Sequence, residues 1–125
     1  MFNLESINSD IRKIIEKIEK GEIKDLSKES IVVQVSIFQS AYERAAVLIR
    51  FNRFCLKNNI KAVKKDFLYI FGEPLIKQDL EKIEKQTKEL SGLIDELCKL
   101  FDLSRPEMEN EDDLLIKFGM KNEDD

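Results

Sequence analysis

Apolar residues recur at helical spacing along most of this chain. In the first twenty residues they form a single stripe, in which most neighbours are three or four positions apart: Ile7, Ile11, Ile14, Ile15 and Ile18. This spacing predicts an amphipathic helix from Asn3 or Ser6 to Lys20. Gly21 is expected to end the helix, because glycine readily adopts the left-handed conformation that closes many helices.

A second apolar stretch runs from residue 31 to residue 54, and Ser27 is placed to cap its start. Residues 31–37 taken alone would suit a strand. We expect a helix, because apolar residues continue to Phe54 without turn residues and the length of the stretch favours a helix. A helix that is apolar around most of its girth cannot bury its whole surface in a chain of 125 residues. We therefore expect this helix to cross a subunit interface.

The remaining pattern predicts one more long helix. Asn58 and Asn59 are expected to break the second helix, and a short segment, 61–71, and a turn, 72–74, follow. The last long helix is predicted over 75–100, with Gly92 as its weak point. Beyond it the helical period ends, and residues 114–118 have the pattern of a short strand.

Composition supports an all-α fold, a helical bundle of long amphipathic helices with this short C-terminal strand. Charged residues make up 37% of the chain, while glycine and proline number only four and two. Residues 1–105 are predicted to form a helical domain, and residues 106–125 an acidic linker and tail. The tail has eight acidic residues and two lysines, so its charge is about −6. Because the formal charge of the whole chain is −4, the helical domain carries about +2.

The sequence offers no chemistry typical of an enzyme, and we expect none, nor a cofactor or a metal. It contains no histidine, the usual general base and the commonest metal ligand. Carboxylate pairs such as Glu16 with Glu19 and Glu81 with Glu84 alternate with lysines, as on a solvated helix face. Two cysteines without CxxC spacing indicate buried thiols in a reducing compartment. No segment resembles a secretion signal or a membrane span, which predicts a soluble intracellular protein.

The strongest functional signal is a run of positive charge. Seven cations and no acid lie between residues 44 and 65. Five of the cations recur at helical spacing: Arg50, Arg53, Lys57, Lys61 and Lys64. Such a stripe is typical of a surface that meets an acidic partner or a nucleic acid, and it is also typical of an ordinary solvated helix face.

Three segments resemble the GINS complex of replicative helicases, in particular its PSF-one type subunit. The chain opens with Met-Phe and a helix containing Ile-Arg-Lys-Ile, which resemble that subunit's opening Met-Phe and its Glu-Leu-Ile-Arg-Glu-Leu helix. Residues 42–53 resemble the central helix of the family, and Arg44 and Arg53 fall on its two arginines. Residues 101–108 and 114–118 resemble the exit of the last helix and the first strand of the family's β-domain, most of which is missing here.

The resemblance implies a non-catalytic subunit of a heterotetramer that supports the replicative helicase in DNA replication. It implies as partners the other GINS-type subunits, the MCM helicase and the Cdc-forty-five protein, and a nuclear location in a eukaryote or a cytoplasmic one otherwise. The partner interface is expected at six residues of the central helix: Tyr42, Arg44, Arg50, Phe51, Arg53 and Phe54. Lys57, Lys61 and Lys64 are expected to contact an acidic partner or phosphates.

Two other hypotheses fit the residues. In the first hypothesis the chain is a small nucleic-acid-binding protein, in which the cationic stripe contacts phosphates and Phe51 or Phe54 stacks on bases. In the other it is a self-associating regulatory helical bundle. A plain alternative for Phe51 and Phe54 is core packing, because aromatic residues three apart on an apolar helix are usually buried.

Overall fold

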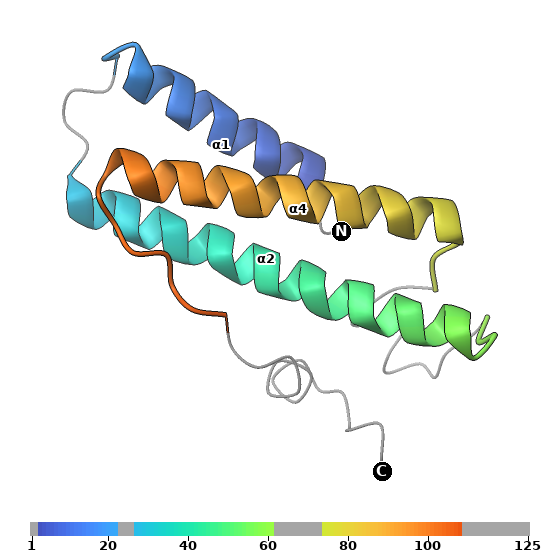
Figure 1. The fold of residues 1–125 in the computed structure, drawn as a ribbon. Helices are drawn as coiled ribbons and strands as arrows, with labels where there is room; N and C mark the ends of the chain where they lie inside the picture. The colour runs from blue at the N-terminus through green and yellow to red at the C-terminus, as the bar shows by residue number, and fades with distance from the viewer. Residues whose placement is uncertain (1–2, 23–26, 62–73, 109–125) are drawn as a thin grey trace. The chain divides into compact units, whose positions relative to one another are not determined.

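The computed structural model describes residues 3–22, 27–61 and 74–108. These residues form three helices, α1 (Leu4–Glu19), α2 (Lys28–Lys57) and α4 (Lys77–Leu100), and no strand (Figure 1). The all-α prediction is confirmed for this part of the chain. The predicted segment 61–71 and the predicted strand 114–118 lie, apart from Lys61, outside the described residues.

The chain divides into two compact units, and two of the helices contribute to both. Unit 1 comprises residues 1–42 and 85–107, and unit 2 comprises residues 43–84 and 108–125. In unit 1 α1 contacts α4 near the middle of that helix through the Asn8 side chain, which donates to the Gln86 backbone carbonyl at 3.1 Å. An ion pair between Arg12 and Glu89 joins the same two helices.

Each unit has its own buried apolar residues. In unit 1 these are Leu4, Ile11, Ile15, Ile31, Val35, Leu90, Ile94, Leu97 and Cys98. In unit 2 they are Ala45, Val47, Ile49, Phe51, Cys55 and Leu80. The predicted stripe of α1 is confirmed at Ile11 and Ile15, whereas Asn8, also buried, interrupts it with a polar side chain.

The predicted caps of α1 and α2 are confirmed. Gly21 has φ 67°, and its N–H donates to the Ile18 carbonyl while the next N–H, of Glu22, donates to the Lys17 carbonyl at 2.9 Å. This pair of bonds is the Schellman motif, which satisfies carbonyls left open at a helix end. At the start of α2 the Ser27 hydroxyl oxygen accepts from the Ser30 N–H at 3.1 Å.

The predicted break after α2 is confirmed as a second Schellman motif. Asn59 takes the left-handed position with φ 53°, and the Ile60 N–H donates to the Cys55 carbonyl at 2.8 Å. Asparagine is one of the few non-glycine residues that adopt this conformation readily, because its short side chain can bond locally. The helix interpretation of residues 31–37 is confirmed as well, since α2 is continuous from Lys28 to Lys57.

The start of α4 differs from the prediction by two residues. Leu75 was expected to begin the helix, but its N–H donates to the side-chain oxygen of Asn52 at 2.7 Å. The helix begins at Lys77 instead, and Leu80 donates to the carbonyl of Ile76 as the first turn closes. Asn52 is 1% exposed, and its NH₂ group donates to the Leu48 carbonyl at 2.8 Å. One buried amide therefore fixes the chain that leads into α4.

The left-handed conformation of Gly21 can be tested by an alanine substitution. Gly21→Ala should lower the free energy of unfolding by about 1 kcal/mol, because alanine is disfavoured at positive φ. An added Cβ would meet nothing within 4 Å, so the cost is conformational and not steric. Urea unfolding followed by circular dichroism measures the change.

Gly92 supplies the matched control, since a Cβ there also meets nothing within 4 Å but the residue lies inside α4. Gly92→Ala should raise the free energy of unfolding by about 0.5–1 kcal/mol, because alanine favours the helix interior. Equal effects of the two substitutions on the free energy of unfolding would contradict the left-handed conformation of Gly21 after the C-terminal end of α1.

Candidate functional site

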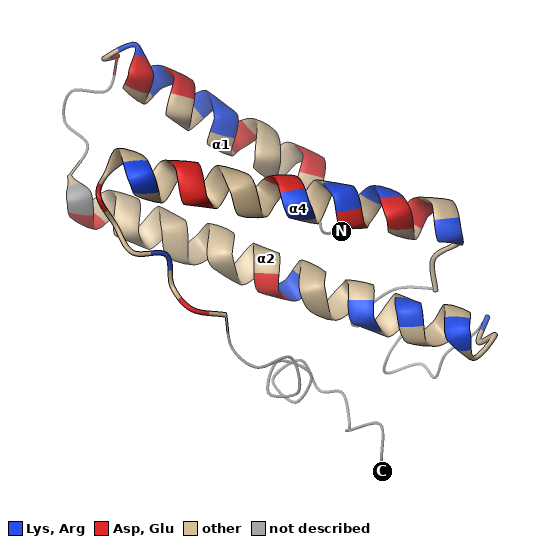
Figure 2. Ribbon diagram, in the orientation of Figure 1, with Lys and Arg blue, Asp and Glu red and all other residues tan. Residues whose placement is uncertain are grey.

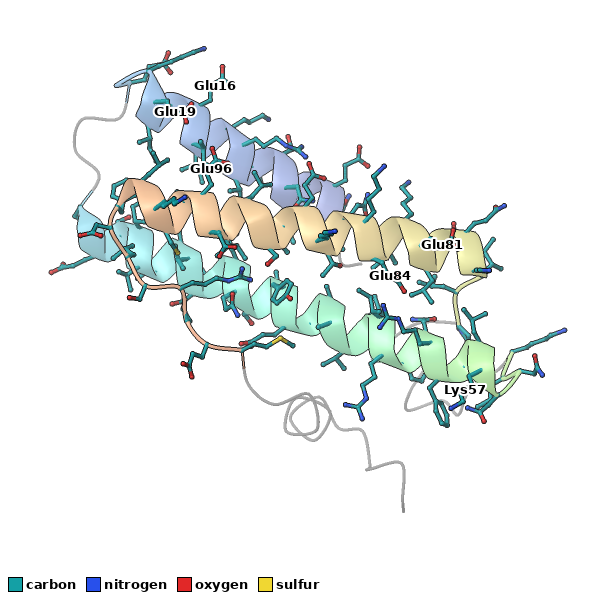
Figure 3. All side chains as sticks on the ribbon, in the orientation of Figure 1. Glu16, Glu19, Lys57, Glu81, Glu84 and Glu96 are labelled. Atoms are coloured by element: carbon teal, nitrogen blue, oxygen red, sulfur yellow. The ribbon has the colours of Figure 1, made fainter. Side chains whose placement is uncertain are left out.

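The cationic stripe of the sequence lies on the second half of α2 and just beyond it. We call Arg50, Arg53, Phe54, Lys57 and Lys61 the basic surface. The first four are three, four or seven residues apart or adjacent, so their side chains share one face of the helix. Figure 2 shows positive residues concentrated on this half of α2, whereas the first half is mostly uncharged. Lys57 lies in the last turn (Figure 3).

The basic surface combines positive charge with an exposed aromatic ring. Phe54 is 40% exposed, and the Arg53 side chain is 65% exposed. Lys57 and Lys61 are exposed as well. Arg53 pairs with Glu84 of α4, its Nε donating to a carboxylate oxygen at 3.0 Å. The other side chains of this set lie in a stretch of sequence, 44–65, that contains no acid.

The structure separates the predicted interface residues into different environments. Phe51 is buried at 4% exposure, so core packing describes it, while Phe54 three residues later is exposed. Arg44 is exposed and Arg50 is half-buried. Tyr42 lies under the guanidinium of Arg105, with 4.8 Å between that group and the ring centre. Lys64 lies outside the described residues.

Sequence reasoning missed a polar cluster centred on Arg105 in unit 1. The Arg105 Nε donates to the side-chain oxygen of Gln39 at 2.9 Å. Its terminal nitrogen donates to the hydroxyl of Ser91 at 2.7 Å and to its carbonyl at 3.1 Å, and it pairs with Asp95 at 3.0 Å. Arg105 thereby holds the segment after α4 against both α2 and α4. A lone arginine after a helix gives no sequence signal of such a role.

The end of α4 prepares this position. Asp102 adopts φ 51°, and the N–H of Leu103 donates to the Cys98 carbonyl at 2.8 Å, a third Schellman motif. The turn reverses the chain after α4 and brings Arg105 back to Ser91 and Asp95. The guanidinium has several donors in a rigid fork, which suits this set of acceptors.

The two cysteines are free and buried, as predicted. Burial raises the pKa of the Cys55 thiol above its ordinary value. Burial also raises the pKa of Cys98, against a smaller opposing effect of the Arg105 charge. A raised thiol pKa favours the protonated form, so its contribution to stability is complete below the ordinary thiol pKa and is lost as the pH rises through the folded value.

The carboxylate pairs lie on helix surfaces. Glu16 and Glu19 are exposed on α1, and Glu81 and Glu84 lie in the first turns of α4 (Figure 3). A hydrogen bond from Lys20 at 2.6 Å, with the charge of that lysine, lowers the pKa of Glu16.

Within residues 3–22, 27–61 and 74–108, no group of three side chains is placed to hold a metal ion. Over the same ranges no helix has the length and apolar character that a bilayer span requires.

The curated relatives of this chain are proteins described as probable translation initiation factor IF-2. That of Methanococcus maripaludis strain C5 is 29% identical over 102 residues, which make up 80% of this chain and 17% of that protein. That of Methanococcus aeolicus is 30% identical over 92 residues, 74% of this chain and 15% of that protein. The chain therefore spans about a sixth of the length of these relatives. No protein-family model matches the chain, and no solved structure is significantly similar to it.

These findings correct the assignment to the GINS family. The resemblance at residues 1–2, 11–14, 42–53, 101–108 and 114–118 is confined to short degenerate motifs, whereas the similarity to the initiation factors extends over 80% of the chain. The predicted GINS subunit of DNA replication is therefore wrong. The sister subunits, MCM and the Cdc-forty-five protein were expected only through that resemblance, and they lose their support with it. The nucleic-acid-binding and self-association hypotheses gain no support from these relatives.

The Arg105 cluster can be tested by two substitutions. Arg105→Ala should lower the free energy of unfolding by about 2 kcal/mol, because hydrogen bonds to a charged, largely buried group are the strong ones. Arg105→Lys should not restore it, because an ammonium cannot reach the same acceptors at once. Asp95→Asn should change the unfolding free energy by less than about 1 kcal/mol, since Asp95 is 62% exposed. Full rescue by lysine would contradict this description.

Thiol labelling of the native protein gives a local readout of the same cluster. Both thiols should react much more slowly in the folded chain than in urea, because both are buried. Arg105→Ala should speed the labelling of Cys98, because the backbone carbonyl of Cys98 accepts a hydrogen bond from Leu103 in the segment that Arg105 holds. Labelling of Cys55, in unit 2, should stay slow. Mass spectrometry of the labelled peptides distinguishes the two cysteines. Equal acceleration at both would show global and not local opening.

Proposed function

We propose that this chain acts in translation initiation as a non-catalytic helical module that binds an acidic protein surface through its basic surface. The similarity to the initiation factors of two Methanococcus species carries the proposal. It extends over most of this chain but over only a small part of each relative. That proportion fits a module with one binding role and not the whole activity of the larger proteins.

The uses of three buried amide side chains support a non-catalytic role. Asn8 donates from α1 to α4, and Asn52 bonds both α2 and the chain that leads into α4. Gln39 accepts from Arg105. Each of these side chains joins one segment to another, which is a structural use. The chain also has no histidine to supply acid–base chemistry near neutral pH.

The basic surface supports the binding role. Aromatic residues and arginine are enriched in protein interfaces, and the basic surface presents both in the exposed Phe54 and Arg53. The cations would steer an acidic partner toward α2, and Phe54 would supply apolar contact once the partner is bound. The proposed partner is an acidic protein of the initiation machinery.

Sedimentation of a lysate on a sucrose gradient tests the proposal. The tagged chain should sediment with small ribosomal subunits or initiation complexes, and it should stay with the protein fraction of those complexes after ribonuclease treatment. Phe54→Ala with Lys57→Ala should weaken the association about tenfold, the loss expected when an interface anchor is removed. The matched control is Lys13→Ala with Lys17→Ala, because both lysines are exposed on α1.

Two results would contradict the proposal. A chain that stays at the top of the gradient at low salt has no stable association with the initiation machinery. An association that ribonuclease abolishes would show that RNA, and not an acidic protein, is what the chain contacts.

A further inference from the structure

The first half of α2 exposes apolar side chains in unit 1. Val32, Val33 and Ile37 are 45%, 60% and 61% exposed, and they are three of the seven large apolar side chains so exposed within the described residues. Val33 and Ile37 lie one turn apart, on the opposite side of the helix from the buried Ile31 and Val35. Apolar residues gathered on one exposed face mark an interaction site, unlike single scattered ones.

The same face of α2 carries no charge. We call Val33, Ser36, Ile37 and Ser40 the apolar stripe, because their spacing places them on one side of the helix. No residue from 30 to 42 is charged. The Ser36 hydroxyl donates to the Val32 carbonyl at 3.0 Å, so its proton is already bonded within the helix and the side chain can be covered at little cost. A charged partner would find no opposite charge here, so the occupant must present an apolar face of its own.

We propose that the apolar stripe binds the same stripe of a second copy of this chain. The two helices run antiparallel, and a two-fold axis passes between Ser36 and Ile37. At about 100° per residue, Val33 and Ser40 both lie near the centre of the face and equally far from that axis. Val33 therefore lies opposite Ser40 of the second copy, and the two Ile37 side chains meet near the axis. A large side chain opposite a small one lets two helices approach closely.

The match of the stripe with itself is what selects a second copy. A two-fold contact brings identical surfaces together, so a charged stripe would repel its counterpart, whereas this one has no charge to repel. Within unit 1 the apolar stripes of the other two helices are already buried, at Ile11 and Ile15 of α1 and at Leu90 and Ile94 of α4. The apolar stripe of α2 is therefore the helix face that unit 1 offers to another copy.

The contact is small, so the dimer is weak and reversible. Residues 30–42 of a helix are only about 18 Å long, at 1.5 Å per residue. One such helix pair buries less than the roughly 1,200 Å² of a standard stable interface, and we expect a dissociation constant of about 0.1 mM. The dimer goes beyond the proposed function and does not depend on it, because the apolar stripe belongs to unit 1 and the basic surface to unit 2.

Sedimentation equilibrium of the full chain tests the proposal. The average mass should rise from monomer toward dimer between about 10 µM and about 1 mM protein. About 1 M sodium chloride should not reverse the rise, because the contact has no charges to screen. Ile37→Glu should weaken the dimer at least about tenfold, since two carboxylates would meet near the axis. The matched control is Ile76→Glu, because Ile76 is 62% exposed but lies in unit 2, and this variant should dimerise like the parent chain.

Disulfide crosslinking tests the antiparallel register. Chains with Val33→Cys mixed with chains with Ser40→Cys should crosslink to each other under mild oxidation faster than either crosslinks to itself. The native Cys55 and Cys98 are buried and do not compete in the folded protein. Circular dichroism of each variant confirms that the helices remain folded.

Three results would overturn the proposal. The first is a chain that stays monomeric over the whole concentration range. The second is a dimer that Ile37→Glu leaves intact or that Ile76→Glu weakens equally. The third is faster crosslinking of Val33→Cys chains to one another than to Ser40→Cys chains, because that result means a parallel contact.

Discussion

The burial of α2 is the constraint on which the described structure depends. This helix supplies Ile31 and Val35 to the core of unit 1 and Ala45, Val47, Ile49, Phe51 and Cys55 to the core of unit 2. Apolar burial is the dominant favourable term in folding, so a helix that serves two cores has few positions left for charge. In its second half those positions hold cations and Phe54, which form the basic surface together with Lys61 just beyond the helix.

Helix ends and single buried polar groups then fix where the chain goes between the helices. Three Schellman motifs close α1, α2 and α4, with Gly21, Asn59 and Asp102 at positive φ. Asn52 fixes the approach to α4, and Arg105 fixes its exit. Some apolar surface stays exposed, including Val33 at 60% and Ile37 at 61% on the first half of α2. These residues are consistent with the expectation that α2 meets a partner, which stays a prediction.

The sequence was sufficient for the helices because their signals are local. The stripe of isoleucines, the capping Ser27 and the break at Asn58 and Asn59 each depend on a few neighbouring residues. The Arg105 cluster could not be predicted, since Gln39 and Ser91 lie far from it in the sequence and only the fold brings them together. The same limit applies to Phe51 and Phe54. Both are aromatic residues in the same apolar stretch of sequence, yet Phe51 is buried and Phe54 is exposed. The GINS assignment failed because short motifs on amphipathic helices recur among unrelated helical proteins.

A photo-activated crosslinker in place of Phe54 tests the central claim most directly, that this face of α2 meets the initiation machinery. Crosslinking in living cells, followed by mass spectrometry of the adducts, identifies what lies against the ring. We predict an intermolecular adduct with an acidic protein of translation initiation, which is absent when the same crosslinker replaces Lys13 on α1. Adducts with proteins of DNA replication, or no intermolecular adduct, would contradict the account.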